Sequence, residues 1–413
     1  MIDTIRNAWK IIDLRKKILY TILMIIIFRL GSCIPVPLLD PAAMKEIFTS
    51  DNSLFGFIDV ISGGAFQNAT IFAMSITPYI NSSIIMQLLT VAIPALERLQ
   101  KQGEDGRKKI AQITRYGTVV LAFIQAIGLY FMLKSYNAVT NLGLLTAVVV
   151  IFTFTAGTAF LMWLGEQITE KGVGNGISLI IFAGIVSRLP SMAQSLYAYA
   201  KGGGIGLIGV VALLIMIVVV VGLVVMMNEA ERRIPVQYAK RVVGRKMYGG
   251  QSTHIPIKVA SAGVIPIIFA MSIMSFPSTI AGFFGVTSQT GGFWGGFLKI
   301  FSSTSWVYAI LYFLLIIFFT YFYTAIQFNP IEMSNNMKKN GGFIPGIRPG
   351  RPTSEYISKT LSRITLVGAI FLGLIAILPI FINLGLGINN FAIGGTSLLI
   401  VVGVALETVK DME

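Results

Sequence analysis

The chain has 413 residues, of which 55% are hydrophobic and 12% are charged, and its mean hydropathy is +0.78. Soluble domains carry about 25% charged residues, so this composition excludes a soluble globular protein and indicates a membrane protein with several spanning helices. The net charge of +14 does not require a nucleic-acid ligand, because basic residues also mark the cytoplasmic loops of membrane proteins.

Ten apolar runs approach the roughly 20 residues that a helix needs to cross a bilayer. In chain order they are 18–34, 71–93, 116–133, 144–164, 177–189, 205–227, 260–284, 307–328, 364–382 and 391–406. They predict an all-α polytopic membrane protein with ten transmembrane helices. Lys and Arg are concentrated in the N-terminal segment and in the loops after the second, sixth and eighth runs. Both termini are therefore predicted to be cytoplasmic.

The basic N-terminus followed by an apolar run is similar to a signal peptide. No small-residue cleavage site follows the run, so it is predicted to remain as the first span.

The segment FGFIDVISGGAFQNA, residues 55–69, precedes the second run and is apolar but interrupted. The interrupting residues are Asp59, Ser62, Gly63, Gly64, Gln67 and Asn68. A lipid-facing helix does not readily carry such polar groups, whereas a helix inside a water-lined funnel does. The glycine pair weakens a helix and permits close packing. A re-entrant structural hairpin is the alternative interpretation of this segment.

Two predicted spans carry polar stripes at helical spacing. Thr77 and Asn81 share a face of the second span, as do Ser83 and Gln87. In the seventh span the stripe consists of Ser272, Ser275 and Thr279. These residues serve either as interhelical hydrogen-bonding groups or as the wall of a polar passage that opens toward lipid.

The sequence contains few of the motifs that are typical of enzymes. The single histidine, His254, lies in a basic loop, and there is no phosphate-binding loop and no His/Cys cluster with metal-ligand spacing. The lone Cys33 excludes an intrachain disulfide framework. The GVGNG segment at 172–176 lacks the strand–turn–helix context of a nucleotide site and is interpreted as a flexible entry to a membrane helix. We expect neither catalysis nor a cofactor.

Ion-coupled transporters usually carry ionisable groups inside their spans. Here the acidic residues lie in loops or at span ends, and Arg29 is the only such group inside a predicted span, near its outer end, where it can snorkel or pair. An ion-coupled small-solute transporter is therefore disfavoured but stays open, because backbone carbonyls also bind ions. A scaffold that docks cytoplasmic factors without transport is a third possibility, which leaves the segment 55–69 unexplained.

Two long basic loops, 228–259 and 329–358, follow the sixth and eighth runs. Loops of this length are often functional. The prolines and glycines of FIPGIRPG, within the second loop, specify a shape rather than a flexible tether.

Several long motifs in fixed order resemble the SecY family of protein-conducting channels, in its bacterial branch. They are TPYINSSIIMQLLT (77–90), GEDGRKKIAQITRYGT (103–118), GEQITEKGVGNGISLIIFAGIV (165–186), QSTHIPIKVASAGVIPIIFA (251–270), FNPIEMSNNMKKNGGFIPGIRPG (328–350) and GGTSLLIVVGVALET (394–408). The resemblance covers essentially the whole chain. The chain stops soon after the tenth run, without the longer basic tail of some relatives, so the resemblance does not carry over contacts made through that tail.

The resemblance implies two inverted five-helix halves, 1–189 and 190–413, arranged as a clamshell about a pore. It implies a lateral gate between the second and seventh spans, lined by Thr77, Asn81, Gln87, Ser272, Ser275 and Thr279. It implies a plug half-helix at 55–69, with Phe57, Ile58, Asp59, Ile61, Ser62, Gly63, Gly64, Gln67 and Asn68 as plug residues. The pore ring of the family maps onto Ile76, Ile80, Ile177, Ile181, Ile268 and Ile400.

The resemblance further implies that the chain passes unfolded, signal-bearing polypeptides across the bacterial plasma membrane and releases hydrophobic segments into lipid. Expected partners are SecE and SecG, the SecA ATPase, the ribosome, signal peptides and precursor chains. SecA and the ribosome are expected to dock on the two long loops, through Lys240, Arg241 and Arg348.

Overall fold

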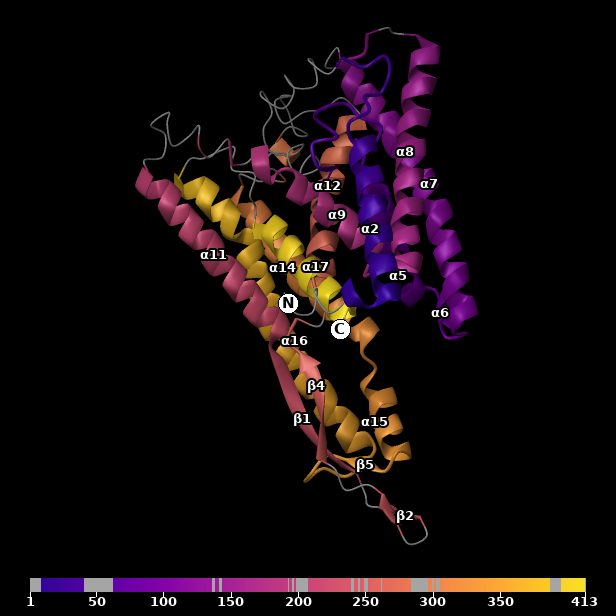
Figure 1. Cartoon of the computed structure of the whole chain (residues 1–413), viewed down its shortest axis with the longest axis vertical. Helices are drawn as coiled ribbons and strands as arrows, with labels where there is room; N and C mark the ends of the chain where they lie inside the picture. The colour runs from indigo at the N-terminus through magenta and orange to yellow at the C-terminus, as the bar shows by residue number, and fades with distance from the viewer. Residues whose placement is uncertain are drawn as a thin grey trace.

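A computed structural model gives the structure of the chain. It describes residues 9–40, 62–135, 138–140, 143–191, 193–194, 197, 207–238, 241–243, 246–248, 252–260, 262–283, 296–298, 301, 305–386 and 395–412. Figure 1 shows a bundle of long helices from which a smaller unit with β-strands projects at one end.

Helices account for all ten predicted apolar runs. They are α2 (Ile12–Gly31), α5 (Thr77–Ala92), α6 (Pro94–Gln100), α7 (Glu104–Ser135), α8 (Leu144–Lys171), α9 (Gly176–Ser187), α11 (Leu207–Glu229), α12 (Ile265–Phe283), α14 (Trp306–Gln327), α15 (Pro330–Lys339), α16 (Arg351–Leu386) and α17 (Gly395–Met412). Each run lies largely within one of these helices. Helices α6 and α15 lie outside the runs.

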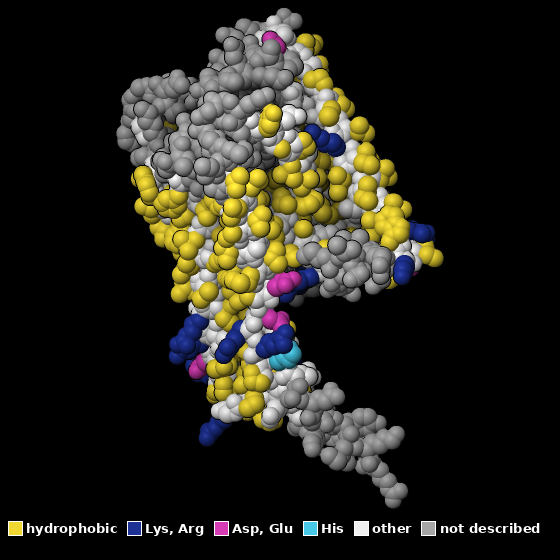
Figure 2. Space-filling model, turned by 60° about the vertical axis from the view of Figure 1, so that its left-hand side comes forward, with side chains coloured by type: hydrophobic (Ala, Val, Ile, Leu, Met, Phe, Trp, Pro, Cys, Tyr) yellow, Lys and Arg dark blue, Asp and Glu magenta, His cyan; other side chains and the backbone are white. Residues whose placement is uncertain are grey.

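Length and composition support membrane crossing for part of this set. Four described helical stretches are long and apolar enough to span a bilayer: Glu104–Lys134, Leu144–Lys171, Trp306–Lys339 and Arg351–Leu378. The pair α5 and α6, bent by 103°, is a fifth if it counts as one span. The total of ten spans stays a prediction. Figure 2 shows an apolar belt over the helices, with Lys and Arg gathered at its edge on the side of the projecting unit.

The second predicted span begins later than expected. The prediction of a run from residue 71 is wrong for its first turn and a half, because α5 begins only at Thr77 and the preceding residues form turns. The backbone there is committed elsewhere: the Ile71 N–H donates to the Ile34 carbonyl, and the Val36 N–H donates to the Ala69 carbonyl. Such pairing with a distant segment competes with helix formation.

Helix packing joins the first and second parts of the chain. Of the helices before residue 190, α7 packs against both α5 and α8, and α9 packs against α8. From the later part, α12 contacts α5, α7 and α14, while α17 contacts α9, α11 and α16. One large cluster of buried aliphatic and aromatic side chains runs through these contacts.

The projecting unit is built from the two long loops, for which the sequence predicted no strands. Strands β1 (Glu231–Tyr238) and β4 (Ser252–Lys258) pair antiparallel, and β5 (Gly342–Phe343) pairs with the other edge of β1. Strands β2 (Arg241–Val243) and β3 (Lys246–Tyr248) form a separate two-stranded pair beyond β1. A small apolar cluster lies under the sheet and includes Ile234, Ile257, Met337 and Ile357. The two loops therefore form one structural unit with its own core.

Candidate functional site

All six isoleucines predicted for a pore ring belong to the same apolar cluster. Four are buried there: Ile76, Ile80, Ile181 and Ile400. Ile177 and Ile268 are partly buried and pack against it. Ile76 is the N-cap of α5 rather than a residue within the helix, and it still lies one turn before Ile80. The structure thus brings together six residues that are widely separated in the sequence.

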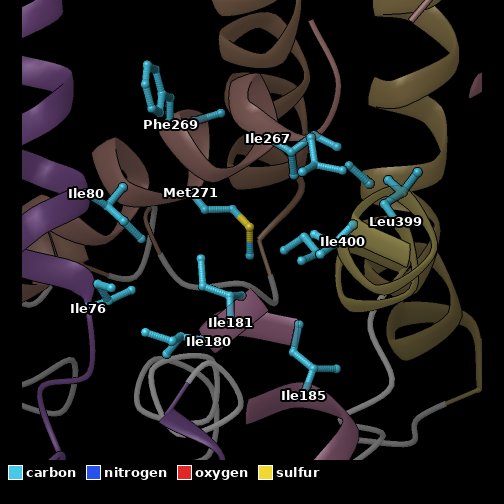
Figure 3. Close-up of a cluster of buried hydrophobic side chains, with 14 of the residues drawn as sticks. Ile76, Ile80, Ile180, Ile181, Ile185, Ile267, Phe269, Met271, Leu399 and Ile400 are labelled. Carbon is cyan, nitrogen blue, oxygen red and sulfur yellow. The ribbon is translucent and has the colours of Figure 1, made fainter. Parts of the chain in front are cut away.

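The cluster contains residues that the sequence analysis missed. Figure 3 shows the Met271 side chain of α12 reaching between Ile181 of α9 and Ile400 of α17. Ile76 and Ile80 lie on the opposite side of Met271 from Ile400 (Figure 3). Ile180, Ile185, Ile267 and Leu399 complete the labelled group together with Phe269. A weak signal was present, because Ile267 and Met271 are four residues apart and share a helix face. Where aliphatic side chains line a narrow passage, they exclude water and close it by dewetting.

The two helices with polar stripes are neighbours. Helix α5 contacts α12, and on them Asn81 and Ser272 are buried while Thr77, Gln87 and Ser275 are half-buried. The side chain of Thr279 lies outside the described residues. The buried amide oxygen of Gln87 has no hydrogen-bond partner in the described part of the chain. The stripes thus lie on two contacting helices, as a seam that opens would require.

Helix α5 is also joined to α7 by a side-chain hydrogen bond. The Ser82 hydroxyl donates to the Thr114 carbonyl of α7 at 2.9 Å, and it is buried. Gly117 of α7 permits this approach, since an added Cβ would lie 2.7 Å from the Ser82 oxygen. Sequence reasoning did not single out Ser82, although small and hydroxyl residues are typical of membrane helix contacts. Helix α5 therefore forms a closely packed, hydrogen-bonded pair with α7.

The segment predicted as a plug lies only partly within the described residues. Phe57, Ile58, Asp59 and Ile61 lie outside them. From Gly63 to Asn68 the chain forms turns instead of the expected half-helix. The reason is the glycine pair, because Gly63 and Gly64 have φ angles of +67° and +87°, a region that ends a helix and favours glycine.

Gly63, the first glycine of the pair, lies against helix α9. A Cβ at Gly63 would lie 3.0 Å from the Gly184 Cα and 2.9 Å from the Ser187 hydroxyl. Ser62 is buried and accepts a hydrogen bond from the Phe66 N–H, whereas Gln67 is half-buried and Asn68 is exposed. Asn68 folds its side-chain amide back onto the Gly64 carbonyl. The prediction that the glycines permit close packing is confirmed for Gly63, whereas a Cβ at Gly64 would meet only the Asn68 side chain, at 3.9 Å.

The GVGNG segment is a tightly packed turn. The interpretation of it as a flexible entry is wrong, because Gly172 and Gly176 pack against the backbone of α8, and Gly172 also lies against the Thr21 hydroxyl of α2. The Val173 N–H donates to the Thr21 hydroxyl, and the Asn175 side chain caps α9 by accepting from Ile177 and Ser178. The turn therefore fixes where α9 begins, and with it the direction of Ile177 and Ile181.

Of the predicted docking residues, the structure describes one in full. Lys240 lies outside the described residues, and Arg241 begins β2 without a described side chain. Arg348 is exposed in the turn between β5 and α16. Thr353 donates to the Arg348 carbonyl at 2.9 Å, and Ser334 of α15 donates to the Gly350 carbonyl at 2.8 Å. The turn has a fixed shape, as its prolines and glycines predicted.

A family relationship accounts for these features together. The SecY family model matches residues 70–409. The protein translocase subunit SecY of Halalkalibacterium halodurans is 47% identical over 424 residues, which cover 100% of this chain and 97% of the relative. The subunit of the same name from Streptomyces coelicolor is also 47% identical, over 430 residues and with the same coverage. The chain belongs to the SecY family.

Solved structures share the SecY architecture. A protein-conducting channel superposes with a TM-score of 0.65 at 20% identity, covering 96% of this chain and 91% of that one. Sec61 of the canine ribosome–channel complex superposes with a TM-score of 0.62 at 18% identity, with the same coverage. The chain is therefore a multi-pass membrane protein with the SecY fold.

Proposed function

We propose that the chain is the channel through which unfolded, signal-bearing polypeptides cross the bacterial plasma membrane, and from which hydrophobic segments enter the lipid between α5 and α12. The observation that carries this proposal is the shared aliphatic cluster. Helices α5, α9, α12 and α17 all contribute side chains to it, so one constriction is closed by both parts of the chain. A seal of branched apolar side chains excludes water yet yields to a passing chain.

The halves of the proposed clamshell are 1–189 and 190–413. Helices of the two proposed halves meet where α12 contacts α5 and α7, and where α17 contacts α9. Five spans in the first half would place the second half in the opposite orientation. Both termini and the projecting unit would then be cytoplasmic, in agreement with the basic residues beside that unit (Figure 2).

The segment 55–69 would be the plug that covers the closed constriction. Its described end carries Ala65, a fully buried member of the same cluster as the ring isoleucines. One structural relative is described as a SecY whose plug domain stabilises the closed state and maintains a membrane seal. The re-entrant hairpin interpretation would give no reason for Ala65 to share a cluster with the ring isoleucines.

The alternative is an ion-coupled small-solute transporter. The positions of the acidic residues argue against it, since they lie in loops or at the ends of the predicted spans. Ion-coupled carriers usually place ionisable groups inside their spans. We therefore retain the polypeptide channel as the function that the geometry supports best.

The proposed energy source is external. Translocation costs work, and a chain with no phosphate-binding loop would depend on SecA or on the translating ribosome. Both would dock on the projecting unit, at Arg348, Arg241 and Lys240. SecE would clamp the two halves, and SecG would lie at the periphery. In this assembly the chain itself would be neither an enzyme nor the holder of a cofactor.

The test is reconstitution of the purified chain with SecE, SecG and SecA in liposomes. We expect ATP-dependent uptake of a signal-bearing precursor into a protease-protected space, and no uptake of the same precursor without its signal. Saturable uptake of a small solute coupled to an ion gradient, without precursor import, would contradict the proposal.

A further inference from the structure

Arg29 has no role in the proposed function so far, and it is the one charged residue inside a predicted span rather than at a span end. It lies in the last turn of α2. Its Nη1 donates a hydrogen bond of 2.9 Å to the carbonyl oxygen of Gly63, 34 residues further along the chain. Gly63 is the first of the two glycines with left-handed φ angles in the proposed plug segment.

The Gly63 carbonyl is a target with a fixed position. The left-handed φ angle of +67° and the contact with Gly184 of α9 determine where this peptide group lies. The turn behind it is held by local bonds, because Thr70 donates to the Ala65 carbonyl through both its N–H and its hydroxyl. The bond from Arg29 thus comes from outside the segment and ties it to α2.

Capping of its own helix does not account for the placement of Arg29. A cation in the last turn interacts favourably with the helix dipole. The end of α2, however, is already capped by Ser32, whose N–H and hydroxyl both donate to the Phe28 carbonyl. The guanidinium instead reaches across to another segment, where a charge-assisted hydrogen bond is stronger than a neutral one.

The chain on the far side of the glycine pair is anchored. Ala69 and Ile71 form backbone hydrogen bonds with Val36 and Ile34, respectively. This stretch is therefore fixed to the residues that follow α2. Displacement of the plug would therefore turn about Gly63 and Gly64, and the Arg29 bond lies at this pivot. Loss of that bond removes a hydrogen bond that joins Gly63 to α2, and it leaves the bonds of Ala69 and Ile71 intact.

We propose that Arg29 is a positioning residue that latches the plug in its closed seat through the Gly63 carbonyl. The inference rests on the proposed function, because it requires the segment 55–69 to act as a plug. The latch stabilises the closed channel by the free energy of one charge-assisted hydrogen bond. A translocating polypeptide must supply that energy before the plug leaves.

The first experiment measures exposure of the plug segment. In a Cys33→Ser background, a Ser62→Cys variant reports the segment at the pivot, and Ala73→Cys reports the anchored stretch, since both positions are buried. With Arg29→Gln, we expect thiol labelling at position 62 by a membrane-impermeant maleimide in sealed vesicles to become roughly tenfold faster, as for loss of one hydrogen bond to a charged group. Thiol labelling at position 73 stays slow.

Two further variants separate the latch from general effects of charge. Arg29→Lys keeps the positive charge and the dipole interaction but loses the planar guanidinium, so we expect intermediate labelling. Lys134→Gln removes an exposed charge from the last turn of α7 and should label as the parent does. If Arg29→Gln does not assemble, Arg29→Lys carries the test. Parental labelling at position 62 in every Arg29 variant that assembles overturns the latch.

A second experiment asks whether Arg29 acts through the plug. In planar bilayers, Arg29→Gln should raise the resting ion current of the full chain but add nothing to a channel that lacks residues 57–68. An equal increase in both backgrounds overturns the latch, because Arg29 would then act without its partner segment. If deletion of 57–68 itself causes no leak, the plug assignment fails, and with it the premise of the latch.

Discussion

Gly176 at the start of α9 and Gly165 on α8 hold these helices in backbone contact. A Cβ at residue 176 would lie 2.0 Å from the Gly165 carbonyl oxygen and 2.7 Å from the Ile168 Cβ. Neither atom belongs to a flexible side-chain end, so any side chain at 176 must push the helices apart. Because α9 carries Ile177 and Ile181, this contact also sets the position of part of the proposed ring.

Gly176→Ala should therefore destabilise the protein and loosen the seal. We expect a loss of about 2 kcal/mol or more, as for overpacking of a close contact, seen as a lower thermal unfolding midpoint in detergent. The resting ion current in bilayers should rise. Gly222→Ala on α11 is the matched control, since no heavy atom lies within 4 Å of its Cβ position. Equal destabilisation by both substitutions would contradict this account.

The helices could be predicted from the sequence because apolar runs of about 20 residues are explicit there. The projecting sheet was missed although β1 alternates: Ile234 and Val236 are buried, and their neighbours Arg233, Pro235 and Gln237 are exposed. The basic residues of this stretch were interpreted as a signal of membrane orientation. The two-residue period that marks a strand was therefore not recognised.

Contacts between distant segments could not be predicted from local patterns. The late start of α5 depends on pairing of Ile71 with Ile34, and the place of Met271 in the cluster depends on how α12 meets α9 and α17. The six ring positions came from family resemblance, since isoleucine is common throughout the spans. Ser82 was overlooked because one hydroxyl in an apolar helix carries no signal until its partner, the Thr114 carbonyl, is placed.

Polar substitution inside the central cluster should make the closed channel leak. Met271→Asn and Ile181→Asn each place an amide among buried aliphatic groups, which favours hydration of the constriction. We expect resting currents in planar bilayers well above those of the parent. Ile310→Asn, on a 60% exposed position of α14, should leave the resting current unchanged. A similar leak from all three variants would count against a localised seal.

The same positions should contact a translocating chain. Cysteines at Ile76, Ile80, Ile177, Ile181, Ile268, Ile400 and Met271 are expected to crosslink to a precursor arrested in transit. The exposed Ile310 serves again as control. Crosslinks confined to positions outside this set would show that the polypeptide takes another route.

Deletion of Phe57 to Asn68 should leave an assembled channel that leaks at rest. Neighbouring residues would replace the plug in part, so we expect transient openings rather than a permanent current. The control is the Gly222→Ala chain, measured in the same bilayers. Resting conductance equal to that of the parent would mean that the segment is a structural hairpin.

Glu407, just after the tenth predicted span, gives a pH-dependent prediction. Burial, followed by the nearby Asp411 carboxylate, raises the pKa of Glu407 above its usual value, while Lys258 opposes the rise. The folded protein thus holds this proton more tightly than the unfolded chain. Its stability should fall as the pH rises from the unfolded pKa through the folded pKa.

Glu407→Gln should consequently raise the thermal unfolding midpoint at pH 7–8. The gain should shrink as the pH falls through the ordinary Glu pKa and disappear at about pH 3, where Glu407 is protonated in both the folded and the unfolded state. Glu170→Gln, at an exposed position on α8, is the control. A gain that is independent of pH would exclude ionisation of Glu407 as the cause.

Arg348 tests the docking surface. Its turn is fixed by the bonds from Thr353 and Ser334, while its side chain is exposed and makes no ion pair among the described salt bridges. A guanidinium on a rigid backbone is suited to a bidentate bond with a carboxylate of a protein partner, which lysine cannot reproduce. Arg348→Glu should therefore impair SecA-driven import strongly, and Arg348→Lys detectably.

The matched control for Arg348 lies three residues away. Arg351 is exposed in the first turn of α16 and already pairs with Glu355 at 3.1 Å. An exposed pair of this kind contributes little to stability, and Arg351→Glu changes the charge of the loop by the same amount as Arg348→Glu. ATP-dependent import into vesicles and the ATPase stimulated by translocation should both remain near normal in Arg351→Glu. If the two reversals have equal effects, the loop acts through its total charge, and the specific role of Arg348 is refuted.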